Sequence, residues 1–267
     1  MKRWLTRLIL TVGVTALPVA SFAQQATSQS PDQQPPAAVG EEGAKPTRGF
    51  VSALGHNLLD DVKHVPRMNS VYWLAGGGAA ALLVHREDNE INGHFAGSKT
   101  ADRLFLPGQY MGSTYTILGA ATTTYLVGRH LHWTRLQHLG MDEIEATLLA
   151  EGYTQGLKLA VRRDRPIQEN GQQSHTYSFP SGHATLTFAA ATVLQQHLGY
   201  KAGLPTYLIA SYVAMSRLHD NRHYASDVVF GAASGVMIGR SVTWHGRNFY
   251  ASPMLVPGGG GIMLAKR

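Results

Sequence analysis

Three short segments of the sequence combine the side chains that phosphate chemistry requires. Residues 158–166 read KLAVRRDRP, residues 180–183 read PSGH, and residues 216–227 read SRLHDNRHYASD. Together they supply cations for phosphate oxygens, a Ser-Gly turn, two histidines and a carboxylate. These groups suffice to hold a phosphate and to attack its phosphorus with an imidazole.

The first segment places two cations, Lys158 and Arg165, seven residues apart. On a helix this spacing puts both on one face, two turns apart. Pro166 would then end the helix, because the residue before a proline avoids the α region. The helix dipole favours cations at such an end. Taken alone, the pattern is more typical of a solvated basic helix end.

The second segment resembles the start of a helix. Ser181 is a good N-cap, and Gly182 lets the backbone approach a ligand closely. Free N–H groups at a helix start bind anions, and His183 would stand beside a bound anion. Taken alone, a capped helix with an incidental histidine is the simpler interpretation.

The third segment closes one helix at Ser216 and Arg217, and His223 and Asp227 follow it four residues apart. Four residues are one helical turn, so the carboxylate can hold the imidazole Nδ1–H and leave Nε2 free as a nucleophile. Taken alone, this spacing is more typical of a surface His–Asp pair.

The conjunction of the segments resembles the phosphatidic acid phosphatase type 2 superfamily, which includes bacterial acid phosphatases, lipid phosphatases and vanadium haloperoxidases. The family pattern is K-x6-R-P, then P-S-G-H, then S-R-x5-H-x3-D, and residues 158–227 match every fixed position. The resemblance implies an all-α fold, a helical bundle of the acid phosphatase/vanadium haloperoxidase type.

The resemblance also implies roles. His223 would form a phosphohistidine, Asp227 would orient it, and His183 would act as general acid and then as base. Five residues would bind the phosphate, namely Lys158, Arg165, Ser181, Gly182 and Arg217. Three cations can neutralise a dianion, and the sequence has no evident metal-ligand cluster, so we expect no metal and no cofactor.

The elements around these segments read independently as helices. Apolar runs rich in Ala, Leu and Val, punctuated by Gly and Pro, favour an all-helical bundle. The expected helices cover about 50–63, 69–84, 109–130, 141–163, 182–198, 203–218 and 224–240.

Several other features are interpreted as structural. Gly76–Gly78 lacks the Lys-Ser/Thr of a phosphate loop and indicates close helix packing. Asp88–Glu90 lacks the ligand spacing of a calcium loop and is expected to be a solvated turn. Five ionisable residues beside the motifs are expected to be solvated or structural: Arg162, Arg163, Asp164, His175 and Arg222.

The ends of the chain suggest export. Residues 1–23 have the basic start, apolar stretch and small-residue cleavage site of a signal peptide, and residues 24–47 form a polar, disordered leader. Residues 48–251 would be the helical phosphatase domain and 252–267 a tail able to form a small hairpin. The expected location is the periplasm or cell envelope of a bacterium. A soluble or peripheral protein is favoured, with an integral membrane protein as the alternative because residues 104–128 carry no charge.

Charge and composition restrict the partners. Residues 1–23 hold three of the 23 Lys and Arg and none of the 17 Asp and Glu, so the rest has a net charge of +3. That balance does not favour nucleic acid as a partner. Without cysteine there is no disulfide and no lipid-modified cysteine.

The predicted function is a metal-independent phosphatase acting on a phosphomonoester or diphosphate of a small molecule or a lipid. Contact with a membrane surface and the oligomeric state stay open. Two alternatives remain: a vanadate-dependent haloperoxidase and a non-catalytic envelope protein.

Overall fold

The computed structural model describes residues 54–59, 62, 68–96, 99–168, 171–172, 174–243, 249–256 and 259–266. The predicted signal peptide (1–23) and leader (24–47) lie outside these residues. The description below concerns the unit formed by residues 43–267.

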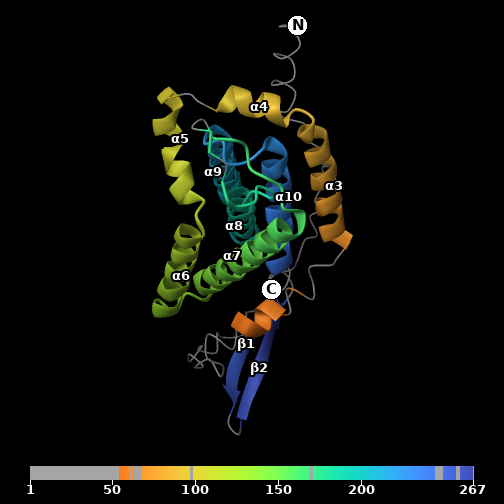
Figure 1. Ribbon diagram of the computed structural model, residues 1–267. Helices are drawn as coiled ribbons and strands as arrows, with labels where there is room; N and C mark the ends of the chain where they lie inside the picture. The colour runs from red at the N-terminus through yellow and green to blue at the C-terminus, as the bar shows by residue number, and fades with distance from the viewer. Residues whose placement is uncertain are drawn as a thin grey trace, which may run out of the picture. The chain divides into compact units, whose positions relative to one another are not determined.

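Between residues 68 and 243 the regular elements of the described chain are all helices, which confirms the predicted all-α class (Figure 1). The helices are α3 (Met68–His85), α4 (Asp88–Phe95), α5 (Lys99–Met111), α6 (Thr114–His130), α7 (Thr134–Val161), α8 (Gly182–Leu198), α9 (Tyr200–His219) and α10 (Ala225–Val242). Residues 54–59 are also helical. Strands β1 (Phe249–Val256) and β2 (Gly259–Lys266) pair antiparallel, with Phe249 opposite Lys266.

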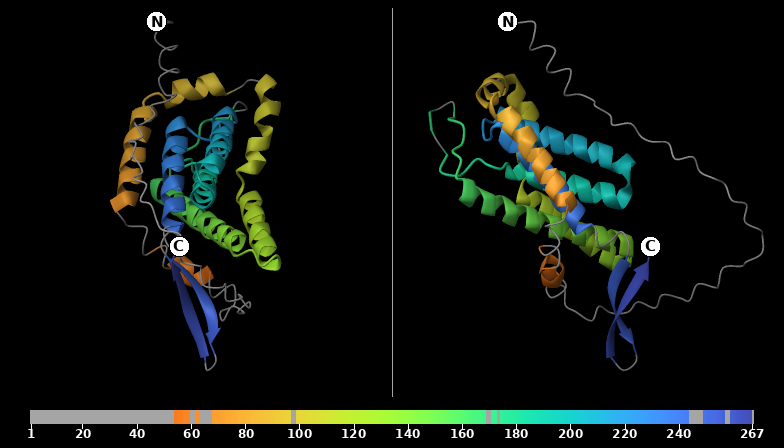
Figure 2. Two further views of the ribbon diagram at one scale, coloured as in Figure 1. Left: turned by 180° about the vertical axis from the view of Figure 1, so that it is seen from behind. Right: turned by 90° about the vertical axis from the view of Figure 1, so that its right-hand side faces the viewer.

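Helix α8 lies at the centre of the helical group and packs against α7, α9 and α10. Around it, α3 packs on α10, α6 on α7 and α5 on α9, while α4 connects the α3 and α5 sides (Figures 1 and 2). The main core lies between α7, α8 and α10. Its buried apolar residues are Leu139, Ala146, Ala150, Leu186, Ala189, Val193, Met237, Ile238 and Val242.

Glycines on α10 bring its backbone unusually close to α8. A Cβ at Gly235 would lie 2.4 Å from the carbonyl oxygen of Thr185, and one at Gly231 would lie 2.7 Å from that of Ser181. At the start of α8, the Ser181 N–H also donates a 3.1 Å hydrogen bond to the Asp227 carbonyl oxygen on α10. Two of the sequence motifs are therefore held together by direct backbone packing.

The segment predicted as one helix over 109–130 is divided between two helices. Helix α5 ends at Met111, and Ser113 caps α6, where its Oγ accepts a 3.2 Å hydrogen bond from the Thr116 N–H. In the described part of the chain, no helix has both the length and the apolar character of a membrane span.

Two other predictions about local structure have opposite outcomes. Close helix packing at Gly76–Gly78 is confirmed at Gly77, where a Cβ would lie 2.3 Å from the Cβ of Ala233. The solvated turn predicted at Asp88–Glu90 is wrong. Asp88 instead begins α4, and only 3% of it is exposed.

Candidate active site

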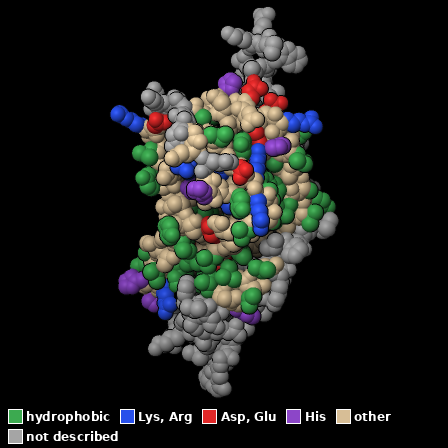
Figure 3. Space-filling model, in the orientation of Figure 1, with side chains coloured by type: hydrophobic (Ala, Val, Ile, Leu, Met, Phe, Trp, Pro, Cys, Tyr) green, Lys and Arg blue, Asp and Glu red, His purple; other side chains and the backbone are tan. Residues whose placement is uncertain are grey.

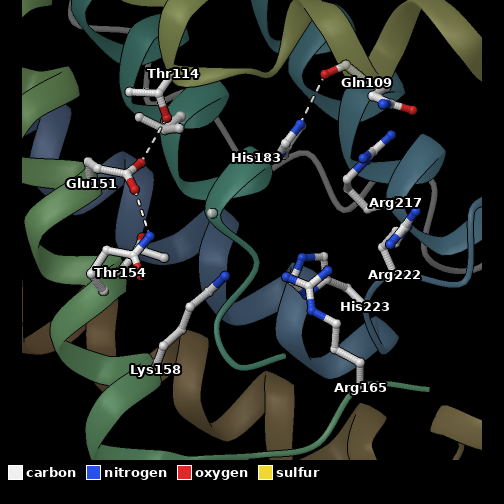
Figure 4. A pocket seen from close by; sticks show the side chains of 13 residues that line it. Gln109, Thr114, Glu151, Thr154, Lys158, Arg165, His183, Arg217, Arg222 and His223 are labelled. Carbon is white, nitrogen blue, oxygen red and sulfur yellow. Dashed lines mark hydrogen bonds between the residues drawn. The ribbon is translucent and has the colours of Figure 1, made fainter. Parts of the chain in front are cut away.

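Most of the site residues predicted from the motifs line a cavity of about 320 Å³ (Figure 4). Six of the eight predicted site residues line it: Lys158, Arg165, Gly182, His183, Arg217 and His223. The other two, Ser181 and Asp227, are fully buried and are not among the residues that line it. The lining also includes residues that the motifs did not nominate, namely Gln109, Thr114, Glu151, Thr154, Gln155, Leu186 and Arg222.

The main chain fixes the tautomer of His223. Nδ1 lies 2.8 Å from the carbonyl oxygen of Ser178, which can only accept, so Nδ1 carries the proton and Nε2 has the free lone pair. Burial lowers the pKa of His223 to about 4, although the nearby Asp227 carboxylate raises it. The imidazole is therefore neutral at physiological pH.

Asp227 is held by several donors and stands at ion-pair distance from His223. Its Oδ2 lies 3.8 Å from Nδ1 of His223, so the hydrogen bond expected between these residues is made by Ser178 instead. Oδ2 accepts from the Ser178 hydroxyl and, at 2.9 Å, from the Tyr224 N–H, and Oδ1 accepts from Arg163 at 2.7 Å. Burial raises the pKa of Asp227, but His223, Ser178 and Arg163 outweigh it and hold the pKa below its ordinary value.

Arg163 connects the Asp227 carboxylate to α4. Its Nη2 donates to Oδ2 of Asp88 at 2.7 Å, and its Nη1 donates to the Ser226 hydroxyl at 2.7 Å. Asp88 also accepts from the Ser226 N–H at 2.9 Å, and the guanidinium lies 4.0 Å from the ring centroid of Tyr224. Of the two roles expected for Arg163, solvated or structural, the structure shows the structural one. Its partner Asp88 was not predicted from the sequence.

His183 stands on the first turn of α8. Ser181 caps this helix as predicted, since its Oγ accepts from the Ala184 N–H at 3.5 Å. Nε2 of His183 donates to the carbonyl oxygen of Gln109 at 3.0 Å. Burial, together with the Arg217 cation, lowers the pKa of His183 to about 4. The ring is therefore neutral at neutral pH, with its proton on Nε2.

Lys158 and Arg165 reach the cavity by a route that differs from the prediction. Helix α7 ends at Val161, and Arg162 takes the left-handed conformation with φ of 52°. Arg165 therefore lies beyond the helix and does not share a helical face with Lys158. Burial, then the Arg165 cation, lowers the pKa of Lys158 to about 8.

Two further arginines complete the charge of the cavity. Arg217, in the last turn of α9, forms an ion pair with Asp220. Arg222, expected to be solvated or structural, is the fourth cation that lines the cavity. Against these four cations the lining has one carboxylate, that of Glu151. A net positive cavity of this kind suits a phosphate dianion. In the described ranges, no group of three or more His, Asp or Glu side chains is placed to hold a metal ion.

Part of the chain matches a known family in sequence comparison. Residues 140–250 match the sequence model of the PAP2 superfamily. This part of the chain is therefore similar to the PAP2 superfamily. Residues 158–227, which contain the three sequence motifs, fall inside the matched range.

Curated relatives are matched over part of their length. A lipid A 1-phosphatase of Porphyromonas gingivalis is 34% identical over 47% of this chain and 27% of the relative. A decaprenylphosphoryl-5-phosphoribose phosphatase of Mycobacterium tuberculosis is 40% identical over 32% of this chain and 49% of the relative. The chain thus spans between about a quarter and a half of the length of these relatives.

Two solved structures are similar in outline. The PAP2 type phosphatidylglycerolphosphate phosphatase of Bacillus subtilis aligns with a TM-score of 0.45 and 17% identity, over 73% of this chain and 94% of that one. LpxE of Aquifex aeolicus aligns with a TM-score of 0.47 and 22% identity, over 61% of this chain and 93% of that one.

Proposed function

We propose that this chain is a metal-independent phosphatase that hydrolyses a phosphomonoester or diphosphate through a phosphohistidine on His223. One observation carries the proposal: Nε2 of His223 has a free lone pair, and four cations line the same cavity. Because burial lowers the pKa of His223 to about 4, this nitrogen is unprotonated at neutral pH.

In the first step, a bond forms between Nε2 of His223 and phosphorus while the bond from phosphorus to the leaving oxygen breaks. A bound phosphate dianion favours the imidazolium form of His183 and raises its pKa above about 4. His183 can then turn its Nε2 proton from the Gln109 carbonyl to the leaving oxygen. Asp227, 3.8 Å from Nδ1, offsets the charge that develops on His223.

In the second step, neutral His183 takes a proton from a water molecule that attacks phosphorus. The N–P bond breaks, phosphate is released, and His223 returns to its neutral form. Lys158, Arg165 and Arg217 would stabilise the phosphoryl oxygens throughout. The Gly182 N–H on the cavity wall would add a donor at the start of α8, while the Ser181 hydroxyl would act as the cap of that helix.

A lipid-linked phosphate ester is the substrate that we favour. The two curated relatives are named for lipid A and for a decaprenylphosphoryl sugar. Hydrophobic side chains also reach the molecular surface in the view of Figure 3. Large exposed ones occur on α3, α5 and α9, including Leu82, Leu83, Leu104, Leu106, Leu204 and Leu208. Such surface supports contact with a lipid phase.

The test is phosphate release by the purified full chain in the presence of EDTA, comparing wild type with His223→Ala and His175→Ala. His175 is exposed and lies outside the cavity, so its variant is the matched control. We expect release by wild type and the control, loss of at least about 1,000-fold in His223→Ala, and an acid-labile phosphoprotein only where His223 is intact. Full activity of His223→Ala, or activity that EDTA abolishes and a divalent metal restores, would refute the proposal.

A further inference from the structure

The cavity has a second polar wall that the phosphate chemistry does not use. Glu151, Thr154 and Gln155 lie on the face of α7 that also carries Lys158, and all four line the cavity. Thr114, from the start of α6, joins them. In Figure 4, Glu151 and Thr114 lie across the opening from His223 and the arginines.

Glu151 is poised as a hydrogen-bond acceptor on this wall. Its Oε2 accepts from Thr114 Oγ1 at 2.9 Å, and its Oε1 accepts from Gln155 Nε2 at 2.7 Å. A carboxylate oxygen can accept a second hydrogen bond, so both oxygens retain capacity. A negative group repels phosphate, so Glu151 is suited to another part of the ligand, while Lys158 on the same helix face serves the phosphate.

Thr154 adds a group that lacks a partner. The residue is 1% exposed, and among the described residues its Oγ1 has no hydrogen-bond partner. A buried, unsatisfied hydroxyl costs stability unless something bonds to it. Since Thr154 lines the cavity, a ligand in the cavity can supply that bond.

The geometry of the proposed reaction directs the leaving group to this wall. In phosphoryl transfer, the attacking and leaving atoms lie roughly in line on opposite sides of phosphorus. His223 attacks from the arginine side, so the leaving oxygen and the group attached to it point toward Glu151 and Thr154 (Figure 4).

We propose that Glu151, Thr154, Gln155 and Thr114 form a subsite for a leaving group rich in hydroxyls, such as a sugar ring. The wall offers acceptors and donors side by side: the carboxylate accepts, the amide of Gln155 donates and accepts, and the threonine hydroxyls do both. Hydroxyl groups need both kinds of partner, whereas an ammonium group only donates. This subsite rests on the proposed phosphatase function and names the class of alcohol that it releases.

The test compares two phosphate esters of a six-membered ring, a hexose 1-phosphate and cyclohexyl phosphate, with wild type and with the variants Glu151→Gln and Thr154→Val. The readout is the ratio of kcat/KM for the sugar ester to that for the cyclohexyl ester. Comparing this ratio between variant and wild type cancels the intrinsic reactivity of the two leaving groups. Glu90→Gln, an exposed change of the same chemical type on α4, is the control.

We expect the ratio to fall about 10- to 100-fold in Glu151→Gln, as for a lost hydrogen bond to a charged group. A fall of about 3- to 10-fold is expected in Thr154→Val, and none in Glu90→Gln. If both subsite variants keep the wild-type ratio, or phosphoethanolamine is preferred to the hexose ester, the subsite proposal is wrong although the phosphatase proposal stands. If neither ester nor a lipid phosphate releases phosphate, the proposed function itself fails. Should Glu151→Gln not fold, Thr154→Val and the wild-type preference decide the matter.

Discussion

Replacing Arg163 by methionine should destabilise the fold strongly, because it leaves two buried carboxylates without their shared cation. The side chains of Asp88 and Asp227 are 4% and 0% exposed, and that of Arg163 is 21% exposed. Breaking a buried pair by removing one partner costs about 3–5 kcal/mol. The low end applies because Arg163 keeps some contact with water, which gives about 3 kcal/mol and a fall in Tm of about 6–12 °C.

The assay is thermal and urea unfolding of Arg163→Met beside Arg162→Met, the same change at the exposed neighbouring position. The control should lose less than about 0.5 kcal/mol. A conservative Arg163→Lys variant should recover part of the loss, since it restores a charge without the bidentate geometry. A cost below about 1 kcal/mol for Arg163→Met would refute the reasoning, because it would mean that the two carboxylates do not depend on this cation.

The pH dependence of this cost gives a second check. The pKa of Asp227 is held below its ordinary value, so its contribution to stability is present above the unfolded-state pKa and is lost as pH falls through the folded-state pKa. Without Arg163 that folded-state pKa rises. The difference in unfolding free energy between Arg163→Met and wild type should therefore shrink as the solution is acidified from pH 7 to pH 4.

Two further predictions follow from the site and its support. Because burial lowers the pKa of Lys158 to about 8, the lysine loses its charge above that pH, and the inhibition constant of inorganic phosphate should rise about tenfold per pH unit beyond it. Lys158→Arg should remove this rise, and an unchanged profile in that variant would contradict the assignment. Gly235→Ala should cost about 1–3 kcal/mol in urea unfolding, because its Cβ would meet the Thr185 carbonyl oxygen at 2.4 Å. Gly76→Ala, whose Cβ would have nothing within 4 Å, should instead be neutral or stabilising, and equal costs for the two would count against close packing of α8 and α10.

Local signals in the sequence predicted the parts of the site that local chemistry determines. Helix α8 spans Gly182–Leu198, as expected, because Ser181 caps its start and Gly199 follows its end. The glycine packing at Gly77 was likewise readable, since a glycine run inside an apolar helix has few other uses. In each case the controlling residues are neighbours in the chain.

Other features depend on partners that are distant in the chain. Arg163 and Asp88 are 75 residues apart, and nothing in either neighbourhood signals that the two charges meet in the interior. The end of α7 at Val161 was also not predictable from the sequence. Helices often end at a glycine in the left-handed conformation, but here an arginine, Arg162, takes that conformation. The sequence could have predicted that Glu151 and Thr154 line the site. They precede Lys158 by seven and four residues and so share its helical face.

The acceptor that orients the His223 ring is a peptide oxygen, that of Ser178. Every amino acid contributes the same oxygen to the backbone, so no substitution at position 178 deletes this acceptor. Asp227 can accordingly be altered without reversing which ring nitrogen carries the hydrogen. The tautomer of His223 and the negative charge beside it are thus set by separate groups, so selection can change Asp227 while the tautomer stays the same.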